Sequence, residues 1–164
     1  MTYKHFGAAL TLGAMLTATA AFADYPERAI NMVIPYGAGG ATDISARTIA
    51  EPLGDAVGKP LIMANVTGAG GATGSVAVQN AKADGYTLYF GASDALVTAP
   101  HSLPVPYSVD SFRGIVGVSF APSSIAVRTD SPWETLDDLL AEAGTDTVID
   151  RGHSGVGGVH HTLL

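Results

Sequence analysis

Short apolar runs that alternate with helical patterns constrain the fold of this chain more than any other feature. The runs cover residues 29–35, 61–66 and 86–91, and a helix-like segment separates each from the next. Apolar runs of this length, bounded by glycine or proline, are typical of buried strands. Strands joined through helices form βαβ units with parallel pairing and right-handed crossovers. The sequence therefore predicts an α/β fold built on a parallel sheet.

The helices between these runs have recognisable ends. Thr42 or Asp43 can cap the first helix, and Gly58-Lys59-Pro60 is expected to end it. The second helix is predicted from about residue 72 to 82. Each helix follows a strand after a short loop.

The pattern changes at Pro100. Residues 100–107 hold three prolines and no helical period, which indicates an irregular connection. Beyond it, strands are predicted at 115–118, 124–127 and 148–149, with a helix starting near Ser131 and carrying Pro132 at its first position. We therefore expect a first α/β lobe over residues 24–99 and a crossover with the beginning of a second lobe over 100–164.

Three glycine-rich loops lie between a predicted strand and a predicted helix. We name them the first (residues 36–40), second (68–71) and third (152–158) glycine loops. Glycine lets the backbone approach a ligand closely, and the first N–H groups of the following helix point outward without an internal partner. Such a loop can hold a carboxylate or a phosphate. The alternative is that glycine only makes the tight turns of a parallel sheet, although three such loops together favour ligand binding.

Nucleotide and catalytic motifs are absent from the sequence. No Gly-Lys-Ser/Thr occurs, and Gly68, Gly70 and Gly74 form GxGxxxG rather than the dinucleotide pattern GxGxxG. The chain has no cysteine, which excludes thiol catalysis, and Ser93-Asp94 lacks the glycine frame of a nucleophile elbow. The sequence predicts no cofactor and no enzyme.

The three histidines near the end, at positions 153, 160 and 161, match no zinc motif. Adjacent histidines on a helix point to different sides, so a capping or supporting role is expected. We predict no metal site and no catalytic residue.

The N-terminus has the features of a secretory signal. A short positive start at Lys4 and His5 precedes an uncharged, mostly apolar run, and Ala21-Phe22-Ala23 supplies the small residues that a signal peptidase reads. We therefore expect residues 1–23 to be removed; the alternative is a retained membrane anchor, for which the apolar run is short.

Export would leave a strongly acidic protein. Loss of Lys4 leaves seven Lys and Arg residues against fifteen Asp and Glu, a net charge of −8. This balance argues against a nucleic-acid surface, which needs a basic footprint. At the other end, the chain stops at GGVHHTLL as a helical pattern begins, so we expect an incomplete C-terminus.

The segments YPERAINMVIPYGAGGATDISAR and NVTGAGGATGSVAVQNAKADGYTLYFG, followed by PYSVDSF, resemble the tripartite tricarboxylate transporter receptor family, the Bug or TctC-like extracytoplasmic solute receptors. The resemblance extends from Tyr25 to about His161. It implies a fold like that of type II periplasmic binding proteins, with a parallel-sheet lobe and the start of a second α/β lobe. It also implies a monomeric periplasmic protein that closes on a small organic acid and delivers it to the permease subunits of a membrane transporter.

The resemblance also implies which residues bind the ligand. Family members hold a ligand carboxylate with backbone N–H groups and small hydroxyls of the first and third loops. Carried over to this chain, with the face of the first lobe included, the ligand-binding positions are Tyr36, Gly37, Ala38, Gly39, Gly40, Thr42, Asp43, Gly70, Gly71, Ser93, Asp94, His153, Ser154, Gly155 and Gly157.

The chain departs from the family at two points. His153 and Gly158 stand where the family usually has serines, so one hydroxyl is lost and an imidazole is added, and the resemblance does not name the acid. Family members are also much longer and return from the second lobe to complete the first. Two other functions stay open: a sensor or adaptor lobe that acts by protein contact, and a secreted hydrolase that uses Ser93 or the histidines.

Overall fold

A computed structural model describes residues 24–153, 155–156 and 158–162. The predicted signal peptide therefore lies outside the described residues. The elements, in chain order, are β1 (Ile30–Ile34), α1 (Ala41–Val57), β2 (Leu61–Asn65), the 3₁₀ turn η1 (Ala69–Gly71), α2 (Ala72–Gln79), β3 (Thr87–Tyr89), α3 (Asp94–Val97), α4 (Ala99–Ser102), the 3₁₀ turn η2 (Val109–Ser111), α5 (Leu136–Ala143) and α6 (Val159–Thr162).

The three predicted strands form one parallel sheet in the order β2-β1-β3. Ile30 pairs with Leu61 on one side of β1, and Asn31 pairs with Thr87 on the other. Four of the five residues of β1 are buried, as expected for a central strand covered on both faces. The predicted parallel α/β sheet is confirmed.

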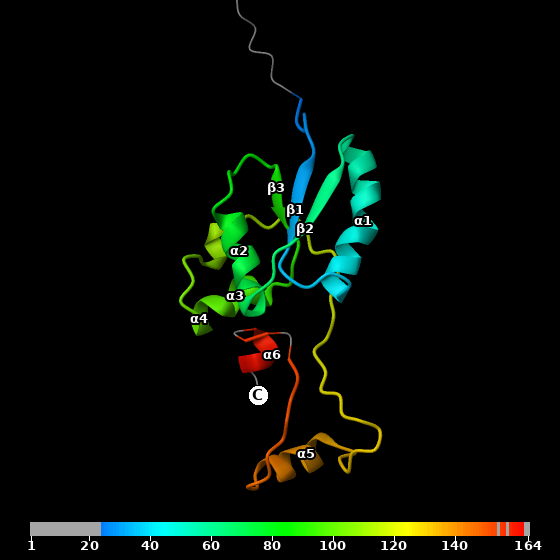
Figure 1. Cartoon of the computed structure of the whole chain (residues 1–164), viewed down its shortest axis with the longest axis vertical. Helices are drawn as coiled ribbons and strands as arrows, with labels where there is room; N and C mark the ends of the chain where they lie inside the picture. The colour runs from blue at the N-terminus through cyan, green and yellow to red at the C-terminus, as the bar shows by residue number, and fades with distance from the viewer. Residues whose placement is uncertain (1–23, 154, 157, 163–164) are drawn as a thin grey trace, which may run out of the picture.

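Helices cover both faces of this sheet. α1 packs against β1 and β2, whereas α2 packs against β1 and β3, and the strands lie between the two helices (Figure 1). On the α1 side the core gathers around Met32, Ile34 and Ala46. On the α2 side Ala72, Ala99 and Tyr107 form a second cluster, so packing on this lobe continues well past Pro100. The result is a three-layered α/β lobe.

The ends of the helices differ in detail from the prediction. α1 ends at Val57. Its C-cap is Gly58, whose φ of 70° is left-handed and whose N–H donates to the Gly54 carbonyl, as the Gly-Lys-Pro sequence indicates. Its N-cap, however, is Gly40, so the expected cap at Thr42 or Asp43 is wrong by two or three residues. α2 ends at Gln79 rather than near residue 82, and α4 occupies the start of a segment predicted to be irregular.

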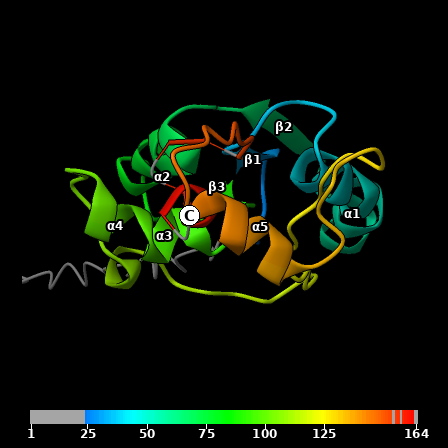
Figure 2. The ribbon, with the colours of Figure 1, turned by 90° about the horizontal axis from the view of Figure 1, so that it is seen from below.

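The strands predicted at 115–118, 124–127 and 148–149 do not form in the described part of the chain. A strand needs a neighbour for its backbone hydrogen bonds, and this segment runs away from the sheet and returns alone (Figures 1 and 2). Its apolar side chains stay in solvent: Ile115 is 79% exposed, Phe120 90% and Val148 86%. Apolar composition alone was therefore not enough to make these strands.

The helix predicted near Ser131 begins later, at Leu136. Thr135 is its N-cap: its hydroxyl accepts the Asp138 N–H at 3.2 Å, and Asp138 accepts the Thr135 N–H at 2.9 Å. This reciprocal capping box determines the start of α5, because it satisfies two backbone N–H groups at once. Pro132, predicted as the first helical residue, offers no side chain that could do this. No helix among the described residues is long and apolar enough to cross a membrane.

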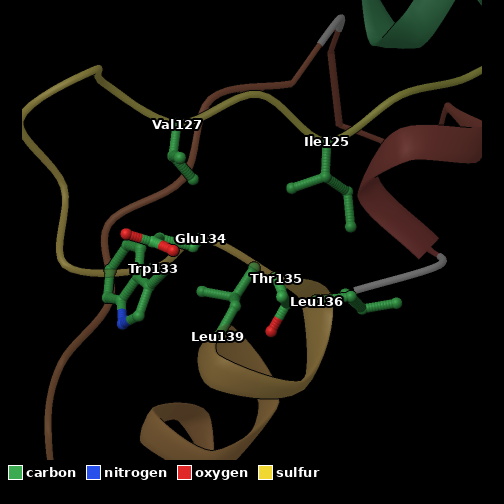
Figure 3. Close-up of a pocket in the computed structure, with 7 residues that line it drawn as sticks. All are labelled: Ile125, Val127, Trp133, Glu134, Thr135, Leu136 and Leu139. Carbon is green, nitrogen blue, oxygen red and sulfur yellow. The ribbon is translucent and has the colours of Figure 1, made fainter.

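A small pocket of about 170 Å³ lies between the extended segment and α5 (Figure 3). Ile125 and Val127 point from the extended chain toward Leu136 and Leu139, and Trp133 closes one end. No residue of the predicted ligand site lines it. This pocket lies in the part of the chain that follows Pro100.

The close packing of α2 on the sheet predicts that Gly74→Ala destabilises the protein. A Cβ at Gly74 would lie 2.8 Å from the Pro35 Cβ and 2.8 Å from the Val66 carbonyl oxygen, so α2 would have to move off the sheet. Overpacking of this kind costs about 1–3 kcal/mol, which outweighs the gain in helix propensity from alanine. Urea denaturation measures the change.

Gly114→Ala is the matched control, because a Cβ there meets nothing within 4 Å. A Gly74→Ala protein as stable as the Gly114→Ala protein would show that α2 does not pack as described.

Candidate functional site

The first and second glycine loops lie at one edge of the sheet, together with the loop after β3. All three follow the carboxyl ends of parallel strands. The chain leaves β1 toward β2 and later crosses back to β3 on the other side of β1, so the strand order reverses between β1 and β3. In open α/β sheets, ligands bind in the crevice at such a point.

The first glycine loop turns directly into α1. The Gly40 N–H bonds the Gly37 carbonyl at 3.2 Å, and Gly39 takes a left-handed φ of 78°, which glycine adopts without strain. Residues 37–40 are exposed. Because the N-cap Gly40 has no side chain, no side chain caps the first N–H groups of α1, and they point outward from the edge of the sheet.

Asp43 is buried beneath this loop, with 2% of its surface exposed. Its Oδ2 accepts the Gly39 N–H at 2.8 Å and the Arg47 Nε–H at 2.9 Å, and its Oδ1 accepts the Asn65 Nδ2–H at 2.9 Å. The Arg47 guanidinium, the Gly39 N–H and Asn65 hold the pKa of this carboxyl well below its usual range. Both oxygens of Asp43 are therefore bonded to the protein, and the carboxylate holds the loop in place.

Asn65 connects the same loop to β2. Its Nδ2 also donates to the Tyr36 carbonyl at 3.0 Å. The sequence reasoning missed both Asn65 and Arg47. Arg47 follows Asp43 by four residues on a helix, the spacing at which opposite charges pair, so this contact could have been found. Asn65 is a polar residue at the end of an apolar strand, a weaker signal.

Tyr36, which follows β1, and Asp94, which follows β3, are joined by a hydrogen bond. The Tyr36 hydroxyl donates to Asp94 Oδ1 at 2.8 Å, and the Ala95 N–H donates to the same oxygen at 2.9 Å. Burial and the Asp94 carboxylate raise the pKa of Tyr36, which keeps the phenol protonated. Ser93 lies exposed beside them in the same loop.

Gly71 lies under the Tyr36 ring. A Cβ at Gly71 would be 3.2 Å from the Tyr36 hydroxyl oxygen and 2.9 Å from the Ala95 Cβ, and its φ of 99° is left-handed. The structure thus brings together four predicted site residues from three separate loops: Tyr36, Gly71, Ser93 and Asp94.

The third glycine loop packs on the second. A Cβ at Gly70 would lie 2.7 Å from the Gly158 nitrogen, and one at Gly155 would lie 3.0 Å from the Gly70 Cα. Backbone meets backbone here, which requires glycine at both positions. Ser154 and Gly157 lie outside the described residues.

The histidines contact different parts of the chain. The rings of His153 and His161 lie 4.9 Å apart, edge to face, whereas His160 Nε2 lies 3.1 Å from the Ser123 hydroxyl. His153 Nδ1 accepts the Gly155 N–H at 3.1 Å, so this side chain supports the third loop. No group of three metal-ligating side chains occurs among the described residues.

A second hollow lies at the opposite edge of the sheet, where α1 ends and β2 begins. It is open, with a volume of about 630 Å³, and Gly58, Lys59 and Pro60 contribute to its lining. None of the predicted ligand-binding residues contributes to it.

Comparison with known proteins relates the chain to solute receptors. The family model described as tripartite tricarboxylate transporter family receptor matches residues 45–162. A UPF0065 protein of Bordetella pertussis is 33% identical over 132 residues, which cover 79% of this chain and 41% of that protein. BugT of the same organism is 39% identical over 119 residues, covering 71% of this chain and 36% of that protein.

Two solved structures are similar to this one. A TctC solute-binding protein from Polaromonas, without ligand, has a TM-score of 0.57 and 37% identity over 71% of this chain and 40% of its own. MatC from Rhodopseudomonas palustris with bound malate has a TM-score of 0.50 and 33% identity over 52% of this chain and 30% of its own. The chain spans about two fifths of the length of the curated relatives it matches.

The geometry around Asp43 predicts a pH-dependent loss of stability in Asp43→Asn. A group with a lowered folded-state pKa contributes stability above its unfolded pKa, about 3.9 for aspartate, and loses it as the pH falls through the folded value. At pH 7 we expect Asp43→Asn to unfold at lower urea concentration than wild type, and the difference should shrink below about pH 4. Urea denaturation at pH 7 and pH 3 measures it.

Asp55→Asn, on the exposed side of the same helix, serves as the control and should unfold like wild type at both pH values. Equal stability of the Asp43→Asn and Asp55→Asn proteins at pH 7 would contradict the role assigned to Asp43.

Proposed function

The chain belongs to the tripartite tricarboxylate transporter family receptors, and on that premise we propose that it captures a small organic acid by its carboxylate. Members of this family are solute-binding receptors, and binding rather than catalysis is the function we assign. The first glycine loop, with the start of α1, is the proposed carboxylate site.

One observation carries this proposal. The first glycine loop is exposed, its position is set by Asp43 and Asn65 from below, and it leads into the uncapped N-terminus of a helix of 17 residues. Backbone N–H groups and the positive end of the helix dipole favour an anion at such a place. The acidic net charge of the chain does not oppose this, because local donors decide anion binding.

The relatives support the choice of ligand class. MatC was solved with malate, a carboxylate. Thr42, at the second position of α1, is half-buried next to the loop and can add a hydroxyl donor. Contacts made mostly by the backbone explain why the sequence pattern indicates a carboxylate without naming the acid.

We propose that the protein is exported to the periplasm through a signal peptide at residues 1–23 and acts as a monomer. In this proposal residues 100–164 begin a second lobe that closes over the ligand, and the loaded receptor delivers the acid to membrane permease subunits. A lobe that acts only by protein contact would need no small-molecule ligand, which the following experiment decides.

The proposal predicts that a carboxylate raises the melting temperature of the protein. Thermal shift assays with a panel of mono-, di- and tricarboxylates at constant ionic strength should show stabilisation that grows with ligand concentration, because the ligand binds the folded state only. Ala38→Asp places a negative charge in the first glycine loop. It should raise the acid concentration needed for a given increase in melting temperature at least tenfold.

Ala83→Asp adds the same charge in an exposed turn before β3, at the other edge of the sheet, and should leave the response unchanged. If no acid in the panel stabilised the protein, or if both variants lost this stabilisation equally, a carboxylate site at the first glycine loop would be contradicted.

A further inference from the structure

The carboxylate of Asp94 is held in place by one oxygen only. Oδ1 accepts both the Tyr36 hydroxyl and the Ala95 N–H. Within the described part of the chain, Oδ2 accepts no hydrogen bond, and it is not among the buried polar atoms that lack a partner. Oδ1 therefore fixes the side chain, and Oδ2 carries no hydrogen bond from the described residues.

This oxygen lies beside the proposed carboxylate site. Tyr36 is the first residue of the first glycine loop, and its hydroxyl is 2.8 Å from Asp94. The two residues follow β1 and β3, the strands on either side of the point where the strand order reverses. A small acid bound by the first loop would therefore lie near the Tyr36–Asp94 pair.

No cation pairs with Asp94 in the described part of the chain. The ion pairs of the described residues are Arg28–Asp84, Arg47–Asp43 and Arg128–Asp130, and none of them involves Asp94. An unpaired carboxylate repels a second carboxylate and accepts a hydrogen bond from a hydroxyl or an ammonium group. The Tyr36 hydroxyl cannot relieve the repulsion, because its proton is already donated to Oδ1.

We infer that Asp94 determines specificity at this site by favouring carboxylates that carry a hydroxyl or ammonium donor over unsubstituted dicarboxylates. The inference rests on the proposed function, since it needs a carboxylate at the first glycine loop. Asp94 contacts the donor of the ligand through Oδ2, and Tyr36 is a positioning residue that holds the carboxylate in the required orientation.

Isothermal titration calorimetry of the full chain with succinate, malate and aspartate tests the inference. These acids share one carbon skeleton and differ at a single position, which bears hydrogen, hydroxyl or ammonium. Malate or aspartate should bind at least tenfold more tightly than succinate, and the comparison of malate with aspartate shows which donor is preferred. In Asp94→Asn the preference over succinate should fall at least fivefold, because the charged acceptor for the hydroxyl or ammonium group is lost.

Asp110→Asn removes the same charge from an exposed position in η2 and should keep the wild-type preference. Circular dichroism confirms that each variant is folded, and the wild-type ratio tests the inference without any variant. Binding of all three acids with equal affinity, or a preference that survives Asp94→Asn, would overturn the role of Asp94 and leave the carboxylate site intact. Absence of binding by every acid would instead overturn the proposed function and this inference with it.

Discussion

The arrangement of the candidate site depends on the buried carboxylate of Asp43. Three donors from three different segments converge on it: the backbone of the first glycine loop, a guanidinium on α1 and an amide at the end of β2. A charge with 2% exposure is stable only when its oxygens are bonded in this way. The consequence is a glycine loop that is flexible by composition but held in one position by a side chain beneath it.

Close backbone contacts hold the three glycine loops together at the carboxyl ends of the strands. Gly71 lets the Tyr36 ring lie over the second loop, and Gly70 lets the third loop approach to backbone distance. The glycines of the three loops therefore have different roles. In the first loop they form the turn into α1 and leave the first N–H groups of that helix without a side-chain cap, whereas in the second and third they bring chain segments together. The alternative that glycine serves only for turns is therefore too narrow for Gly70, Gly71 and Gly155.

The lobe could be predicted from the sequence because its determinants are local. Apolar runs of strand length, a left-handed glycine at Gly58 and alternation with helices specify the parallel sheet without knowledge of distant contacts. The strands predicted at 115–118, 124–127 and 148–149 do not form for the opposite reason. Their formation depends on a distant partner, since a strand forms only where another strand accepts its hydrogen bonds. Likewise, Tyr36 and Asp94 were both predicted site residues, but their contact over 58 positions follows from strand order and could not be read from spacing.

The central claim is that the first glycine loop and the start of α1 bind a carboxylate through backbone N–H groups. Amide chemical shifts during a titration with malate, followed by two-dimensional NMR, report on these groups one by one. The account predicts that the largest shifts occur at the amides of residues 37–42 and saturate together. Shifts concentrated at the opposite edge, around Gly58 and Lys59, or no saturable shifts at all, would contradict it.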